Sequence, residues 1–243
     1  MDNITSVNNN HIKELCKLKE KKYRDSTNSF LVEGEHLIYE AYKEGLLIEV
    51  LPLIGEDFSI DTKITFITPE VMKKLSSTDT IPKVIGVSKK RKEDIIGNKV
   101  LILEDIQDPG NLGTIIRSSL AFNVDTIVLS LRCVDLYNPK VIRATQGSLF
   151  HINIIVRDID LFIRELKTRE YKIFGTKVDG GLDIRSINLP SKYALIIGNE
   201  GQGMSKETTS LCDNLLYIKM NNEIESLNAG VAASILLYEM ENK

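Results

Sequence analysis

The sequence predicts an α/β protein in which a parallel-sheet domain follows a smaller α/β domain. Runs such as VLILE at 100–104 and ALIIG at 194–198 are apolar on both faces, as parallel strands covered by helices are. From residue 100 onward, strand-like runs alternate with glycine-containing loops and amphipathic helical segments. With 243 residues, 42% hydrophobic and 27% charged, the chain fits one large domain or two small ones and is not disordered as a whole.

The first part of the chain predicts a small α/β unit. Periodicity and end signals predict helices over 9–24, 35–43 and 69–75. Strand-like runs lie at 29–33, 46–53, 63–68 and 83–87. Residues 88–99, SKKRKEDIIGNK, then depart from both patterns and carry five Lys or Arg side chains. We therefore expect an amino-terminal domain over 1–92, with a basic linker at its end, and a second domain over 93–243.

The second part repeats a strand, a loop and a helix. Strands are predicted over 100–106, 125–130, 151–156, 171–176, 193–198 and 215–220. Helices are predicted over 112–122, 139–146, 158–169 and 226–241. In an open α/β sheet, ligands bind at the carboxyl ends of the strands. The polar and glycine-rich residues that follow three of these strands are therefore the candidate site.

Composition argues against several classes of protein. Cys16, Cys133 and Cys212 lie far apart with no CxxC pair, and the three histidines share no metal-ligand spacing, so neither a disulfide framework nor a metal site is expected. The net charge of −3 means that a polyanion would have to bind local basic patches. No secretory signal is visible, and Ala229–Tyr238 is about half of the ~20 residues that cross a bilayer. We expect a soluble cytoplasmic protein.

The first candidate segment, DPGNLGTIIR at 108–117, follows the strand predicted over 100–106. Asn111 is placed to cap the helix that begins next. Arg117 lies four residues after Gly113, so both face one side of the helix and the arginine can extend past a residue without a side chain. A solvent-exposed helix arginine is an equally good interpretation of Arg117.

The second segment, IIGNEGQGMS at 196–205, has three glycines in six residues after a buried strand. Such a loop passes close to another group or adopts positive φ. Its glycine spacing is not that of a dinucleotide fingerprint, and it lacks the GK[ST] ending of a P-loop. A tight turn explains one glycine but not three with a glutamate among them.

The third segment, IKMNNEIESLNAGVAAS at 218–234, contains the start of the last helix, which Ser226 or Asn228 can cap. Small residues then leave much of that helix nearly bare: Ala229, Gly230, Ala232, Ala233 and Ser234. Tight packing on the helix's own sheet and contact with a partner helix in a dimer explain these small residues about equally well.

In this order the three segments resemble the motifs of the SpoU (TrmH-type) branch of the SPOUT RNA methyltransferases. The matching residues are Asn111–Arg117, Gly198–Gly203 and Ser226–Asn228. The match spans Val100–Tyr238, about the length of that family's catalytic domain. The first third resembles, more weakly and through FLVEGEHLI at 30–38, the small RNA-binding domain akin to ribosomal protein L30e that many members carry.

The resemblance implies a trefoil knot near the carboxyl end, a homodimer formed through the knotted domain and the last helix, and no metal. It implies transfer of a methyl group from S-adenosylmethionine to a ribose 2′-hydroxyl in RNA, with ribosomal RNA expected and transfer RNA as the alternative. Carried over residue by residue, the cofactor-binding positions are Thr176, Gly198, Asn199, Gly201, Ile218 and Leu227. The catalytic positions are Arg117, Asn111, Glu200, Ser226 and Asn228.

A guanidinium is a poor base because its pKa lies above about 12, so we expect Arg117 to stabilise the developing alkoxide as a fixed cation. Two other functions stay open: a non-catalytic RNA-binding protein, and a nucleotide-dependent oxidoreductase. Retention of Arg117, Glu200 and Asn228 argues against the first, and the missing fingerprint against the second. RNA would bind local basic patches, which are the first helix with Lys13, Lys17, Lys19, Lys21, Lys22 and Arg24, the stretch 89–92, and the group Arg132, Lys140 and Arg143.

Overall fold

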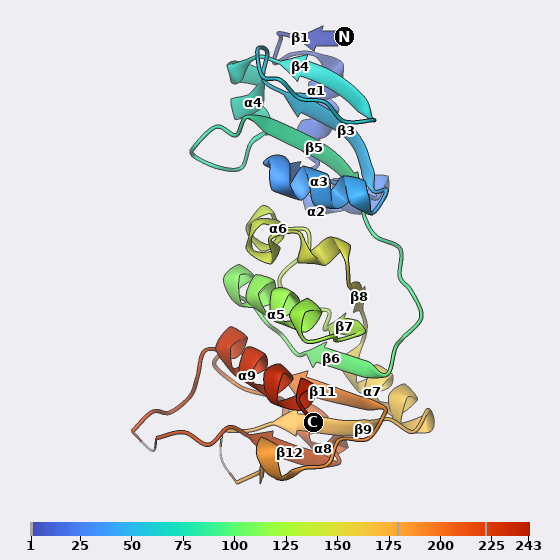
Figure 1. Ribbon diagram of the computed structural model, residues 1–243, viewed down its shortest axis with the longest axis vertical. Coiled ribbons are helices and arrows are strands. Elements are labelled where there is room, and N and C mark those ends of the chain that lie inside the picture. The colour runs from blue at the N-terminus through green and yellow to red at the C-terminus, as the bar shows by residue number, and fades with distance from the viewer. Residues whose placement is uncertain (1, 179, 222) are drawn as a thin grey trace. The chain divides into compact units, whose positions relative to one another are not determined.

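The computed structural model describes residues 2–178, 180–221 and 223–243, and over these residues the chain folds into two compact units (Figure 1). The first unit comprises the chain up to Lys92 together with Asp135–Phe150, and the second comprises Glu93–Val134 and His151–Lys243. Residues 135–150, which we expected in the second domain, thus pack in the first unit. Among the described residues, helices fall short of the length and hydropathy that crossing a bilayer requires.

The first unit is built on a mixed sheet with the strand order β1-β4-β3-β5-β2. β4 pairs in parallel with β1 and β3, whereas β5 runs antiparallel to β3 and β2. The strands are β1 Asp2–Ile4, β2 Ser29–Glu33, β3 Leu47–Pro52, β4 Lys63–Ile67 and β5 Val84–Lys89. The helices are α1 Asn10–Lys17, α2 Lys21–Thr27, α3 Glu35–Lys43, α4 Pro69–Leu75 and α6 Pro139–Thr145. A 3-10 turn, Ser148–Phe150, follows α6.

The single helix expected over 9–24 is wrong, because the chain leaves helical geometry between α1 and α2. Arg24 of α2 turns back and donates hydrogen bonds from Nη1 to the carbonyl oxygens of Leu18 (2.9 Å) and Lys19 (2.8 Å). The buried Arg24 also forms an ion pair with Asp135. Its side chain therefore satisfies carbonyl groups at the end of α1 that have no partner within the helix.

Aromatic packing adds to this ion pair in holding the segment 135–150. The fully buried ring of Phe30, on β2, has its centroid 4.6 Å from that of Tyr137 and 6.1 Å from that of Phe150. α6 contacts β2 as well. Tyr137 and Phe150 thus supply part of the hydrophobic core of the first unit, although they follow Phe30 by more than a hundred positions in the sequence.

The second unit is a parallel sheet with the strand order β10-β12-β9-β11-β6-β7-β8 (Figure 1). Val100 and Ile102 of β6 pack with α7, and the intervening Leu101 is also fully buried. Burial of both faces is what the apolar runs predicted, and the parallel-sheet fold is confirmed. The strands are β6 Lys99–Leu103, β7 Thr126–Leu129, β8 Asn153–Val156, β9 Lys172–Thr176, β10 Leu182–Asp183, β11 Tyr193–Ile197 and β12 Asn214–Tyr217.

The helices of the second unit pack in pairs. They are α5 Pro109–Ala121, α7 Ile159–Thr168, α8 Lys206–Leu211 and α9 Ala229–Glu241, with a 3-10 turn at Ile184–Ser186. α5 packs against α9, and α7 against α8. A Cβ on Gly230 would lie 3.2 Å from Thr114 of α5, and the hydroxyl oxygens of Ser118 and Ser234 are 2.7 Å apart. Small residues of α9 therefore allow α5 of the same unit to approach closely.

Asp135→Asn should destabilise the protein, because the buried Arg24 guanidinium would lose its counter-charge. We expect the free energy of unfolding in urea to fall by about 3 kcal/mol. Glu20→Gln is the matched control, since the Lys22–Glu20 pair is exposed and such pairs contribute about 1 kcal/mol or less. Equal unfolding free energies for the two variants would contradict a stabilising role for Asp135.

Candidate active site

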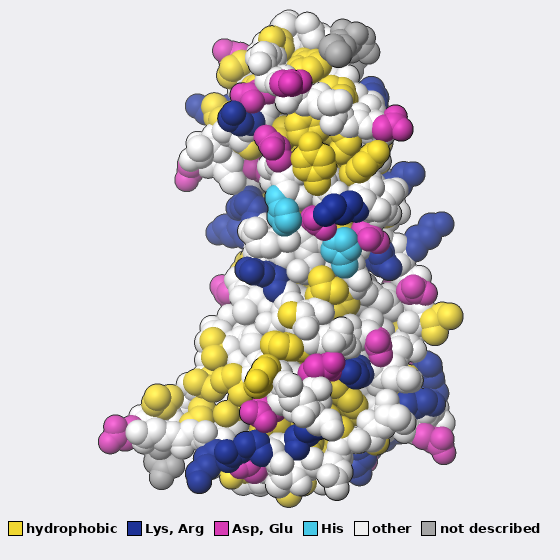
Figure 2. All heavy atoms as spheres, in the orientation of Figure 1, with side chains coloured by type: hydrophobic (Ala, Val, Ile, Leu, Met, Phe, Trp, Pro, Cys, Tyr) yellow, Lys and Arg dark blue, Asp and Glu magenta, His cyan; other side chains and the backbone are white. Residues whose placement is uncertain are grey.

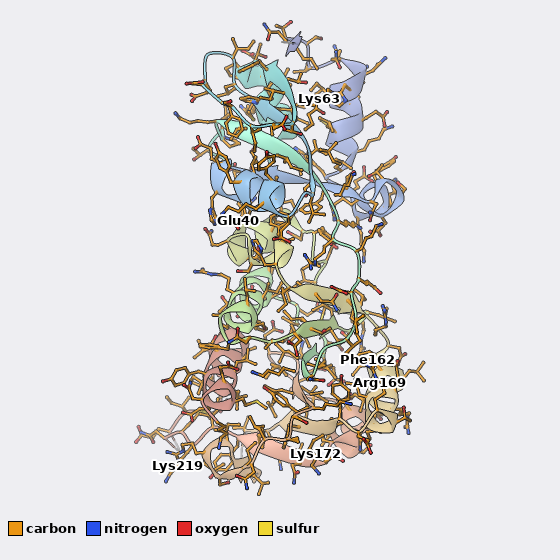
Figure 3. The ribbon with its side chains drawn as sticks, turned by 45° about the vertical axis from the view of Figure 1, so that its right-hand side comes forward. Glu40, Lys63, Phe162, Arg169, Lys172 and Lys219 are labelled. Carbon is orange, nitrogen blue, oxygen red and sulfur yellow. The ribbon has the colours of Figure 1, made fainter. Side chains whose placement is uncertain are left out.

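A cavity of about 460 Å³ lies in the second unit where neighbouring strands end. β11 lies between β9 and β6, and β12 lies next to β9, so the carboxyl ends of these parallel strands meet at one edge of the sheet. Figure 3 labels Lys172 at the start of β9 and Lys219 just beyond the end of β12, on opposite sides of this unit. All the residues expected to bind a cofactor line the cavity: Thr176, Gly198, Asn199, Gly201, Ile218 and Leu227.

The glycine loop at 198–204 forms one wall of the cavity. Asn199 and Gly203 exchange backbone hydrogen bonds of 3.0 and 2.9 Å, which closes the loop on itself. A Cβ on Gly198 would lie 2.3 Å from the backbone of Gly203 and Met204, so the position admits no side chain. Gly203 has a φ of +68°, the left-handed region that favours glycine. Gly198 is therefore required by the close approach of the backbone, and Gly203 by its positive φ.

Two consecutive residues after β6 hold this loop from its two ends. The side-chain amide of Asn199 donates to the carbonyl oxygen of Asp105 at 2.8 Å. The buried carboxylate of Glu104 accepts from the backbone amide of Ser205 at 3.1 Å and from the hydroxyl of Thr208 at 2.7 Å. Ser205 is also the residue that caps α8. Glu104 therefore fixes the point at which the glycine loop enters α8.

The three candidate segments are joined by a chain of side-chain hydrogen bonds. Asn228 donates from Nδ2 to Oδ1 of Asn111 at 2.8 Å, and Asn111 donates from its own Nδ2 to Oε1 of Glu200 at 3.1 Å. Asn228 also caps α9, because its Oδ1 accepts from the amide of Val231. Of the two caps considered for the last helix, the structure thus uses Asn228.

Asn111 is not an N-cap, contrary to our expectation. α5 begins at Pro109, and Asp108 caps it by accepting from the amide of Asn111 at 2.8 Å. Proline is favoured at the first helical position because it has no N–H to satisfy. The helix therefore starts almost one turn earlier than expected, which leaves the Asn111 side chain free to bridge Glu200 and Asn228.

Glu200 is an ionised carboxylate held by amide donors. Burial acts to raise its pKa, but hydrogen bonds from the Asn111 side chain and from the backbone amides of Asp108 and Gln107 bring the pKa below its usual value. The carboxylate therefore stays negatively charged at neutral pH. Its place on the glycine loop and its partners on the segment before α5 make it a clamp between the two.

The remaining two catalytic candidates lie in different places. Ser226 is exposed and lines the cavity. Arg117 is exposed on α5 and lines a shallow groove between α5 and α9, together with Ser118, Phe122, Ile235 and Tyr238. The structure thus brings Asn111, Glu200 and Asn228 together, places Ser226 at the cavity and leaves Arg117 apart from it.

Several residues of the site were missed by sequence reasoning. Glu104 was counted within the strand over 100–106, and its position directly after a buried run was the available signal. Met204 and Leu236 line the cavity without any polar signal in the sequence. Among the described residues, His, Cys, Asp and Glu side chains form no cluster that could hold a metal ion.

Comparison with protein families matches each part of the chain to a known family. Residues 98–238 match the SpoU rRNA Methylase family, and residues 9–86 match the MRM3-like substrate binding domain. The chain is 36% identical, over 99% of both sequences, to the 23S rRNA (guanosine(2553)-2′-O)-methyltransferase RlmP of Bacillus subtilis.

Two solved structures show the same fold over nearly the whole chain. An rRNA methyltransferase from Sinorhizobium meliloti superimposes with a TM-score of 0.88 at 27% identity, covering 99% of this chain and 97% of that one. Its AdoMet-bound form gives a TM-score of 0.87 at the same identity and coverage. The resemblance drawn from the motifs is confirmed: the chain belongs to the SpoU rRNA methylase family and is an S-adenosylmethionine-dependent RNA 2′-O-methyltransferase.

Proposed function

We propose that the chain methylates the ribose 2′-hydroxyl of a guanosine in 23S rRNA. The observation that supports this substrate is the similarity to RlmP, which extends over 99% of both chains. It therefore includes the part of the chain that matches a substrate-binding domain. A similarity limited to the methylase part would support the reaction but not the choice of RNA.

The cavity suits S-adenosylmethionine in size and in chemistry. Its volume of about 460 Å³ falls within the range of about 300–1,000 Å³ of small-molecule sites. Met204, Ile218 and Leu236 offer apolar surface, and the loop from Gly198 to Gly203 offers backbone hydrogen-bonding groups. We assign cofactor binding to Thr176, Gly198, Asn199, Gly201, Ile218 and Leu227. When bound there, the cofactor supplies an electrophilic methyl group.

The polar residues then divide into positioning and reacting roles. Asn111, Glu200 and Asn228 fix the glycine loop and the start of α9 relative to α5. Ser226 lies at the cavity and is the candidate to orient the ribose hydroxyl. In-line alignment of this weak nucleophile supplies much of the rate in such a transfer.

Arg117 suits a role that involves a second copy of the chain. The groove that contains it also presents Ala121, Phe122, Ile235 and Tyr238, and Figure 2 shows hydrophobic side chains gathered over α9. These apolar side chains are open to contact with a second chain. We propose a homodimer through this face, in which Arg117 becomes enclosed and acts as a fixed cation that stabilises the developing alkoxide.

Methyl transfer to purified RNA tests the proposed function. We expect radioactive methyl from S-adenosylmethionine to enter 23S rRNA at one guanosine ribose, mapped by resistance of the adjacent phosphodiester to alkaline cleavage. Label confined to 16S rRNA or transfer RNA would contradict the proposed substrate.

Arg117→Ala should slow single-turnover transfer by about 10²–10³-fold, and Arg117→Lys should retain part of the rate. Arg164→Ala, an exposed arginine on α7, is the control.

Glu104→Gln tests how the cofactor loop is held. The substitution keeps the shape but weakens the hydrogen bonds to Ser205 and Thr208, so S-adenosylhomocysteine should bind about tenfold more weakly in calorimetry, since charged hydrogen bonds contribute about 1.5–3 kcal/mol. The KM for the cofactor should rise while kcat changes little. Glu207→Gln, exposed in the first turn of α8, should bind like wild type. An unchanged affinity in Glu104→Gln would show that the loop holds its shape without this carboxylate.

The homodimer is tested by charge on the groove. Tyr238 is 54% exposed and its ring lies 5.8 Å from that of Phe122, so Tyr238→Glu should give monomers in sedimentation velocity at micromolar concentration and lose activity. Val156→Glu introduces the same charge at an exposed position on β8 and should leave the dimer intact. A wild-type chain that sediments as a monomer would refute the dimer.

A further inference from the structure

Some cations of the first unit contact acids, and others contact neutral oxygens. Many form ion pairs with an acid: Lys17–Glu14, Lys22–Glu20, Lys43–Glu40, Lys63–Glu49, Lys83–Glu56, Lys90–Asp25 and Arg91–Glu44. Lys19 and Arg143 instead donate to neutral oxygens. Nζ of Lys19 donates to the carbonyl oxygen of Ser76 at 2.9 Å, and Nη1 of Arg143 donates to the hydroxyl of Ser77 at 2.8 Å. The two cations therefore meet adjacent residues of one loop.

That loop, residues 76–80, is held by Glu33 at the end of β2. Ser77 donates to Oε1 of Glu33 from its backbone amide at 2.8 Å and from its hydroxyl at 2.6 Å. Ser76 and Thr78 donate to Oε2 at 2.9 and 3.1 Å. The Glu33 carboxylate is thus occupied by donors of the loop. Because the Ser77 hydroxyl gives its proton to Glu33, its oxygen is left to accept from Arg143.

This arrangement orients two cations without neutralising them directly. Arg143 uses one of five N–H donors in its contact with the loop, and Lys19 uses one of three. Lys73 and Lys74 in the last turn of α4 add positive charge immediately before the loop, and the acids that oppose these four cations are Glu33 and Asp79. The net charge of these side chains is positive. The remaining N–H donors of Arg143 and Lys19 are available to an acceptor outside the protein.

We propose that Lys19, Arg143 and the loop 76–80 form a docking surface for the sugar-phosphate backbone of the RNA substrate. This inference rests on the proposed function and locates where the substrate meets the first unit. Phosphate oxygens accept hydrogen bonds from Arg and Lys, and phosphate and sugar also bind Ser and Thr hydroxyls, which set the position of an RNA without reading its sequence. The exposed Thr80 adds one such hydroxyl in the same loop.

The surface also combines residues from both family matches. Lys19 and the loop belong to residues 9–86, which match the substrate-binding domain, whereas Arg143 belongs to residues 98–238, which match the methylase. Arg143 is placed by α6, within the segment that Asp135 and the aromatic contacts of Phe30 hold in the first unit. A substrate-binding domain limited to residues 9–86 would therefore lack one of its phosphate contacts.

Filter binding of the full-length chain to a 23S rRNA transcript over a range of salt tests this surface. Arg143→Ala and Lys19→Ala should each weaken RNA binding about five- to tenfold and lower the log–log salt slope by about 0.7–0.9, the value for one lost phosphate contact. Arg143→Lys should recover the slope because it keeps the charge. Calorimetric affinity for S-adenosylhomocysteine should be unchanged in all three, which separates RNA docking from general damage to the fold.

Lys83→Ala is the matched control, since Lys83 is an exposed lysine of the same unit that is already paired with Glu56. It should bind RNA like wild type, and a loss equal to that of Arg143→Ala would overturn the proposed surface. So would variants at Lys19 and Arg143 whose affinity and salt slope match wild type while the wild-type chain binds and methylates 23S rRNA. A wild-type chain that neither binds nor methylates 23S rRNA would instead overturn the proposed function.

Discussion

A chain of hydrogen bonds from Glu200 through Asn111 to Asn228 holds three distant parts of the sequence together at one edge of the parallel sheet. The two outer partners also bind backbone groups: Glu200 accepts amides that precede α5, and Asn228 caps α9. The cavity wall, the start of α5 and the start of α9 consequently cannot move independently. The geometry of the cavity, our proposed cofactor site, therefore depends on this linkage.

The lining of the cavity could be predicted because its determinants are local. Thr176 ends β9, Gly198 directly follows β11 and Ile218 directly follows β12. In a parallel sheet the carboxyl ends of the strands meet at one edge, so the buried strands predict the candidate segments, whereas the individual cofactor-binding residues are implied by the resemblance to the SpoU family. The trefoil knot implied by the resemblance stays a prediction, because it depends on how the chain threads and not on which residues lie near a strand end.

Contacts between distant residues account for what could not be predicted. Glu104 reads as the end of an apolar strand until its partner Ser205, 101 residues later, is placed beside it. The break between α1 and α2 likewise depends on Arg24, whose counter-ion Asp135 lies 111 residues away. The start of α5 is a different case, because the signal that decides it is local: Asp108 and Pro109 begin the helix before Asn111, which has the residue type of a cap. Local propensity located most elements but not the short β1, β10 and α8, and it misjudged the ends of α1 and α2 where a distant side chain decided them.

The acids around the cavity indicate how the ribose hydroxyl loses its proton. Glu104 is occupied by Ser205 and Thr208, and Glu200 is occupied by amides that lower its pKa. A carboxylate with a lowered pKa whose lone pairs are already in hydrogen bonds is a weak general base near neutral pH. Glu200 is therefore better suited to holding the loop than to removing a proton, and the Glu104 carboxylate is already engaged by Ser205 and Thr208. This leaves alignment of the hydroxyl and stabilisation of the developing negative charge as the contributions that we propose for the protein, with Arg117 as the proposed cation for the second, and the proton is then free to leave to solvent.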